Sequence, residues 1–175
     1  ACLFDLNQDG WIDFTICDDN AASRVYLNNE NGQLIRDTNF IDLVLPGMGN
    51  SAGNYGCIWT DYDWNGIPEL YISKCKPGVN DPRDPRRLNL FYVYDSLNQD
   101  WTNQAEKLGL DIGDQSWASL FEDFNNDGLL DVFVINHYTP CTILKQTAKH
   151  HYENITTTSG LDYSGIAIQA VAFDY

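Results

Sequence analysis

Three nine-residue segments of the chain share one pattern of oxygen-bearing side chains. Each has Asp, Asn or Glu at its first, third, fifth and ninth positions and Gly at its sixth. The segments start at Asp5, Asp61 and Asp123 and are called loops one, two and three below. Oxygen atoms at alternate positions around a turn suit a hard cation such as Ca²⁺, which takes about six to eight oxygen ligands. Glycine at the sixth position permits a backbone turn that a Cβ atom would hinder.

The pattern predicts up to three Ca²⁺ sites, in which the carbonyl of the seventh residue joins the four side chains as a ligand. Loop two departs most from the pattern, with Asn at position five and with Glu, preceded by Pro68, at position nine, so its metal binding is the least strongly predicted. The predicted ligands are Asp5, Asn7, Asp9, Trp11 and Asp13 in loop one; Asp61, Asp63, Asn65, Ile67 and Glu69 in loop two; and Asp123, Asn125, Asp127, Leu129 and Asp131 in loop three.

Two other interpretations of these loops fit the sequence less well. A polar turn rich in Asn, Asp and Gly explains a single copy, but it explains three matched copies poorly. The EF-hand is a second Ca²⁺ motif, which requires Glu at position twelve and flanking helices. Position twelve holds Ile16, Ile72 and Val134, and the flanking residues are β-branched or aromatic, as in strands. The EF-hand therefore fails on both the ligand and its context.

The loops recur at intervals of 56 and 62 residues, which indicates a repeat architecture. We predict repeat units over approximately residues 1–50, 51–112 and 113–163, with an incomplete fourth unit over 164–175. A fourth loop would start at Asp174. Residues 38–50 are predicted to link the first two units. The whole chain, residues 1–175, is then one partial β-propeller domain.

Each unit is predicted to hold four short strands, because apolar and aromatic runs alternate with turns. Asn31-Gly32, for example, is a strong hairpin signal. Runs that are apolar on both faces, such as residues 132–135, fit blades stacked radially. The expected class is all-β, with about three four-stranded antiparallel blades, the start of a fourth and almost no helix. The predicted strands cover residues 1–4, 13–17, 23–27 and 33–37; 56–60, 70–73, 90–94 and from 101; 117–122, 132–135, 141–145 and 152–156; and 166–173.

A small residue that recurs at one position of every unit indicates that each unit has an equivalent innermost strand. Four residues before the first Asp of each unit stand the small residues Ala1, Cys57, Ser119 and Ala170. Small side chains fit a strand crowded near a central axis. Cys57 is therefore interpreted as a packed small residue rather than a reactive one.

Composition limits the classes of partner and compartment. A formal net charge of −15 argues against nucleic acid, whose phosphates attract basic surfaces. The chain has no run of 18 apolar residues and so no predicted membrane span, and no signal peptide is visible. Five cysteines leave at least one unpaired within the chain, and the sequence does not reveal their connectivity. Asn154-Ile155-Thr156 is an N-glycosylation acceptor, a tripeptide that also arises by chance.

The units resemble FG-GAP repeats, the blades of the integrin α-subunit propeller. Tyr55-Gly56 followed by loop two is similar to the Phe-Gly opening and Ca²⁺ loop of that repeat. A closer resemblance is to the variant in cartilage acidic protein and related bacterial surface proteins. In that variant a hairpin like residues 25–32 and a closing Gly-Leu like Gly109-Leu110 follow the metal loop. Because such propellers usually have about seven blades, the resemblance implies that these units are part of a larger assembly.

The resemblance implies a calcium-stabilised extracellular or cell-surface module that is not an enzyme. Its partners would be a protein or glycan ligand, in adhesion, or neighbouring subunits of a surface assembly. An alternative is the scaffold of a larger secreted enzyme whose catalytic residues lie elsewhere, and a third hypothesis is a purely structural blade stack. His137, Cys141, His150 and His151 are the candidate catalytic side chains, and we interpret them as turn or surface residues.

Overall fold

Twelve strands and one short helix form the regular structure of the described residues, 1–44, 51–161, 163 and 165–172 of this computed structural model. The strands form three four-stranded antiparallel sheets, each in sequence order. The first sheet contains β1 (Cys2–Phe4), β2 (Asp13–Ile16), β3 (Arg24–Asn28) and β4 (Leu34–Asp37). The second contains β5 (Asn54–Thr60), β6 (Glu69–Lys74), β7 (Leu90–Asp95) and β8 (Asp100–Asn103), and the third β9 (Ser116–Glu122), β10 (Asp131–Asn136), β11 (Thr142–Ala148) and β12 (His151–Asn154).

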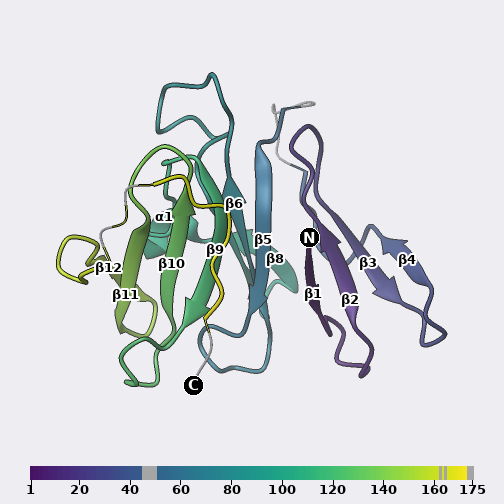
Figure 1. Cartoon of the computed structure of the whole chain (residues 1–175). Helices are drawn as coiled ribbons and strands as arrows, with labels where there is room; N and C mark the ends of the chain where they lie inside the picture. Colours follow the sequence, from purple (N-terminus) through teal and green to yellow (C-terminus); the bar gives the residue numbers. More distant parts are fainter. Residues whose placement is uncertain (45–50, 162, 164, 173–175) are drawn as a thin grey trace.

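The three sheets lie side by side with their first strands innermost. Strand β5 contacts both β1 and β9, while β4 and β12 lie at the outer edges in Figure 1. Each sheet is a chain of consecutive hairpins, and each of loops one, two and three joins the first strand of its sheet to the second. The three loops therefore lie at one end of the molecule, which is the lower end in Figure 1.

Two hydrophobic cores join the sheets. Between the first and second sheets, the Trp59 indole donates a hydrogen bond to Thr15 Oγ1 at 2.7 Å and packs beside Leu70 and Val25. Between the second and third sheets, the ring of Phe91 stacks on that of Phe121 with 5.7 Å between centroids. Every residue of β6 is buried, so the second sheet packs on both faces, as its apolar sequence predicts.

The inner strands of the second and third sheets approach closely at Gly56. A Cβ atom there would lie 2.5 Å from the carbonyl oxygen of Trp117. The neighbouring Tyr55 ring stacks on the Trp117 ring, with 5.4 Å between centroids. The aromatic-Gly pair thus joins two sheets, because the aromatic ring supplies contact area and the glycine admits the facing backbone.

We expect Gly56→Ala to lower the free energy of unfolding by about 1–3 kcal/mol, because the added methyl group would force β5 and β9 apart. Urea denaturation monitored by circular dichroism measures this change. A variant as stable as the parent protein would show that the two strands do not need this close approach.

The predicted all-β class with three four-stranded antiparallel sheets and almost no helix is confirmed. The exception is α1 (Ala105–Leu108), which the sequence analysis missed. This single turn buries Ala105 and Leu108 and ends at Gly109, whose φ of 73° is left-handed. In the described part of the chain, α1 has four residues, and no helix there is long and apolar enough to cross a bilayer.

The C-terminal segment differs from its prediction. Residues 166–172 form no strand, although a strand over 166–173 was predicted to open a fourth unit. Their backbone makes no hydrogen bond with another strand of the described structure, and a strand needs such pairing. The rest of that prediction, including the loop start at Asp174, and residues 45–50 of the predicted linking loop lie outside the described residues.

Candidate metal centre

The three loops share one backbone conformation. In each loop the residue at position four has a left-handed φ between 57° and 59°, and the glycine at position six has a φ between 84° and 89°. Left-handed values are unusual for residues other than glycine, so their recurrence at matched positions marks a common turn. The residues concerned are Gln8 and Gly10, Trp64 and Gly66, and Asn126 and Gly128.

Backbone amides orient the polar side chains within each loop. In loop two, both carboxylate oxygens of Asp61 accept hydrogen bonds, from the amides of Asn65 and Gly66 at 2.9 Å each. The Asn65 side-chain oxygen accepts a bond from the amide of Ile67 at 2.7 Å. Equivalent bonds form in loops one and three, where the amides of the seventh residues, Trp11 and Leu129, donate to Asp9 and Asp127.

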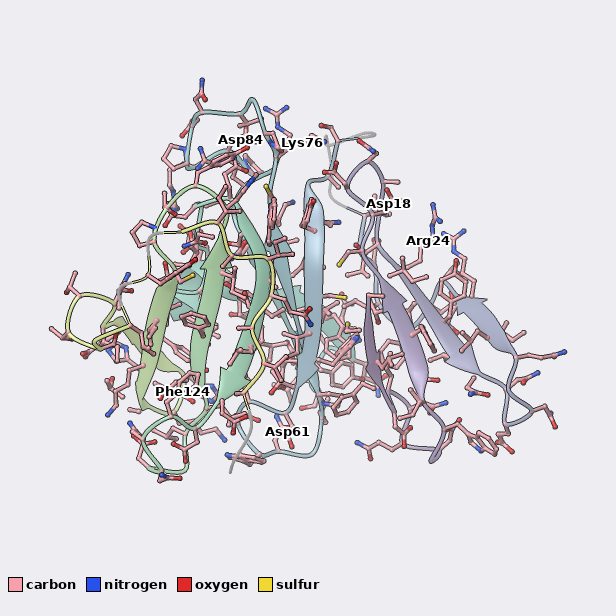
Figure 2. All side chains as sticks on the ribbon, in the orientation of Figure 1. Asp18, Arg24, Asp61, Lys76, Asp84 and Phe124 are labelled. Carbon is pink, nitrogen blue, oxygen red and sulfur yellow. The ribbon has the colours of Figure 1, made fainter. Side chains whose placement is uncertain are left out.

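Neighbouring loops are also joined to one another. The Gln8 side chain of loop one donates to the carbonyl of Gly66 at 2.5 Å. The Trp64 indole of loop two donates to the carbonyl of Gly128 at 3.0 Å. Both bonds run from position four of one loop to position six of the next, so the loops form a row. Figure 2 shows Asp61 and Phe124, from loops two and three, at this end of the molecule, opposite Lys76 and Asp84.

Three carboxylates converge in loop two. Asp61, Asp63 and Glu69 each place an oxygen within 4.8 Å of the others, and among the described residues no other group of three acidic, His or Cys side chains does so. Asp63 Oδ1 and Glu69 Oε1 are both buried and have no hydrogen-bond partner. Buried oxygens without donors are costly unless something binds them. A hard cation fits this set of oxygen donors.

The structure explains how Glu69 is held. Its side chain is fully buried, and its other oxygen, Oε2, accepts a bond from the Tyr62 amide at 3.2 Å. Burial, with a smaller contribution from the nearby Asp63 and Asp61 charges, raises the pKa of Glu69 to about 8 against the lowering effect of the Tyr62 amide. Without a cation, the carboxylate therefore resists ionisation at neutral pH.

Two basic side chains from the third sheet reach loop two. Lys149 Nζ lies 3.4 Å and His150 Nε2 3.9 Å from Asp63 Oδ2. The His150 ring also hydrogen-bonds the Tyr62 hydroxyl through Nδ1 at 2.5 Å. Sequence reasoning missed both residues as neighbours of the site, because they precede β12 and lie far from loop two along the chain. The turn before β12 thus covers one side of the centre.

Loops one and three hold their ninth residue differently. Asp13 is buried, and its two oxygens accept bonds from the amides of Leu6 and Asn28, at 2.8 Å each. Asp131 accepts a bond from the Gln146 amide at 2.8 Å, and burial raises its pKa. In loop three, Lys145 Nζ lies 3.7 Å from Asp127 Oδ2.

Backbone amides thus donate hydrogen bonds to the ninth residues of loops one and three. In loop two, by contrast, Glu69 Oε1 is buried and has no hydrogen-bond donor. The side chains at position three, Asn7 and Asn125, donate to Asp9 and Asp127 of their own loops. Loop two, for which the sequence predicted metal binding least strongly, is the loop that gathers three carboxylates.

Of the candidate catalytic side chains, His150 contacts loop two, whereas His137, Cys141 and His151 lie away from it. The His137 ring packs between those of Trp117 and Tyr138, with centroid distances of 3.9 and 3.8 Å. Cys141 is buried, and His151 lies 3.6 Å from Glu153.

Comparison with known proteins assigns part of the chain. The model of the FG-GAP-like repeat family matches residues 5–72, from the first residue of loop one to the interior of β6. The matched segment includes loops one and two whole. No curated protein matches the chain. Residues 5–72 are therefore similar to an FG-GAP-like repeat.

Proposed function

We propose that this chain is a calcium-stabilised β-propeller module that binds other molecules rather than transforming them. The observation that carries the proposal is the cluster of Asp61, Asp63 and Glu69, with two buried oxygens that lack donors. The cluster occurs in a loop whose conformation recurs in loops one and three.

Calcium is the cation that this set of ligands favours. All the candidate donors are oxygens, which hard cations prefer, and Ca²⁺ accepts irregular arrangements more readily than Mg²⁺ does. In loop two the carboxylates would be joined by the Asn65 side chain and the Ile67 carbonyl. Loops one and three would bind further ions through their own side chains and the carbonyls of Trp11 and Leu129. A bound cation would neutralise repulsion between neighbouring carboxylates and hold the turn between two strands.

The exposed faces of the outer sheets support a propeller arrangement. On the first sheet, Leu3 and Ile16 are about half exposed, on the face opposite the buried Thr15 and Val25. On the third sheet, Leu120 and Phe133 line a groove on the outer face. Apolar side chains on an open sheet face favour a packing partner. Further blades, stacked as the three described sheets are, would cover both faces.

An extracellular or cell-surface setting follows from the proposed chemistry. Calcium sites with millimolar affinity suit extracellular modules. Asn154, at the end of β12, is exposed and would be accessible for glycosylation. The FG-GAP resemblance favours a protein or glycan ligand, or a neighbouring subunit of a surface assembly, as the partner. The role in adhesion or assembly is part of the proposal.

A thermal melt tests the stabilising role. We expect 1 mM Ca²⁺, roughly ten times the expected dissociation constant, to raise the melting temperature by about 3–6 °C for each site filled. Mg²⁺ at the same concentration is the control and should have a smaller effect. A midpoint that is the same in Ca²⁺ and in chelator would contradict the proposal.

We expect Lys149→Ala to tighten calcium binding at loop two by about two- to fivefold. The lysine amine competes with the cation for Asp63, and because Lys149 is half-exposed its ion pair is worth less than about 1 kcal/mol. Lys107→Ala removes an exposed lysine from α1 and is the matched control. Calorimetric titration measures the affinities. Weaker binding in Lys149→Ala would contradict the placement of the ion beside Asp63.

A further inference from the structure

Three of the five cysteines lie together between the first and second sheets. The sulfur of Cys2 in β1 is 2.7 Å from that of Cys57 in β5. Cys17, just beyond β2, also neighbours Cys57 and interacts with its thiol. Cys75 and Cys141 are buried apart from this group, and Cys75 Sγ accepts a hydrogen bond from the Trp117 indole. Cys57 is thus the central member of a thiol cluster.

We infer that Cys2 and Cys57 form a disulfide that links the first sheet to the second. Their separation lies well inside the usual contact distance of two non-bonded sulfurs, and it is only about 0.7 Å longer than a disulfide bond. Each cysteine belongs to an inner strand, and these two strands contact one another directly. The bond would therefore form without rearranging either sheet.

The two thiols are accessible to a small oxidant. Both are only partly buried. Together with Tyr55, Gly56 and Trp117, they line an open groove along the inner strands. The natural oxidant is a small-molecule disulfide of the oxidised-glutathione class, which prevails where structural disulfides form.

The reaction is a two-step thiol–disulfide exchange. The hydrogen bond with Cys17 lowers the pKa of Cys57, but the bond with Cys2 and burial outweigh it and raise that pKa to about 12. Because a thiolate is the nucleophile, the raised pKa of Cys57 disfavours that thiol as the first attacking group. Cys2 gives up its proton, attacks the small disulfide and releases one small thiol. The Cys57 sulfur then gives up its proton and displaces the second small thiol, so two protein thiols are oxidised and one small disulfide is reduced to two thiols.

The cross-link would constrain the unfolded chain. Cys2 and Cys57 are 55 positions apart, so their bond closes a long loop, and long loops lose the most entropy when they are closed. We expect the oxidised chain to melt about 5–10 °C above the reduced chain. The effect requires no bound metal and does not rest on the proposed calcium sites.

The test is to equilibrate the purified chain with oxidised and reduced glutathione, alkylate it under denaturing conditions and map its peptides by mass spectrometry. We expect a linked peptide pair containing Cys2 and Cys57, lighter by two hydrogen atoms, and alkylation of the other three cysteines. Cys2→Ala should lose both the link and the gain in melting temperature. Cys141→Ala, which removes a distant thiol, should keep both.

Three outcomes would overturn the inference. They are alkylation of all five cysteines, a link between Cys17 and Cys57, and a stable glutathione adduct without an internal link. The mapping uses the parent protein, so it remains decisive even if a variant fails to fold. The result should be the same in Ca²⁺ and in chelator, which separates this test from that of the metal sites.

Discussion

In the absence of metal, Glu69→Gln is expected to raise the free energy of unfolding at pH 7 by about 2–3 kcal/mol. The wild-type carboxylate is fully buried, has one oxygen without a donor and lies beside two other carboxylates. The amide of Gln has nearly the same shape and carries no charge. Replacing a metal ligand ordinarily weakens a metal site, so a gain in stability of the metal-free protein is a distinctive result.

The pH dependence follows from the pKa of Glu69, which is about 8 in the folded protein and ordinarily 4.5. The folded state holds the proton more tightly than the unfolded state does, so metal-free wild-type protein loses stability as the pH rises from about 4.5 to about 8. Glu69→Gln should lack this loss. In Ca²⁺ the order should reverse, because only the wild-type carboxylate ligates the ion.

Urea denaturation at pH 5, 7 and 9, in chelator and in Ca²⁺, measures both effects. Glu106→Gln, which changes an exposed glutamate of α1, is the control and should follow the wild type. A Glu69→Gln variant that is less stable than wild type in chelator would show that the buried Glu69 carboxylate does not destabilise the metal-free protein.

Lys74→Met is expected to raise the free energy of unfolding at pH 7 by about 2–3 kcal/mol. Lys74 is fully buried in β6, and its amine has no hydrogen-bond partner. Burial lowers the pKa of Lys74 to about 8 from its ordinary 10.5, against a smaller raising effect of Asp84. Methionine fills a similar volume without a charge.

The size of this effect also depends on pH. The buried amine costs its full amount below about pH 8, and the cost fades as the pH rises toward 10.5, where the unfolded lysine also loses its proton. The gain from Lys74→Met should therefore be large at pH 7 and small at pH 10. Denaturation at the two pH values tests this, with the exposed Lys107→Met as the control. An equal gain at both values would contradict a charge-based origin.

Local chemistry explains what could be predicted from sequence. The Asn31-Gly32 turn places Gly32 at a φ of 78°, and the hairpin between β3 and β4 forms around it. Runs that are apolar on both faces became the buried β6 and β10. The Gly at position six of each loop has the left-handed φ that its turn requires. Each of these features depends on residues close together in the chain.

Contacts between sheets could not be predicted in the same way. Lys149 and His150 reach Asp63 only because the third sheet packs beside the second. The approach of Cys2 to Cys57 likewise depends on how two inner strands pack. The sequence indicated metal binding least strongly for loop two, but the structure indicates it most strongly there. The extra methylene of Glu69 brings a third carboxylate beside Asp61 and Asp63, whereas backbone amides bind the corresponding Asp13 of loop one. Such distances are set by tertiary packing.

A calorimetric calcium titration of wild type and Asp63→Asn tests the central claim, that Asp61, Asp63 and Glu69 hold a cation. We predict that wild type binds Ca²⁺ with a dissociation constant near ~0.1 mM and that Asp63→Asn weakens the loop-two site at least ~10-fold. Asp95→Asn, an aspartate at the end of β7, is the control and should bind as wild type does. Identical isotherms for wild type and Asp63→Asn, or no heat of binding in wild type, would contradict the account.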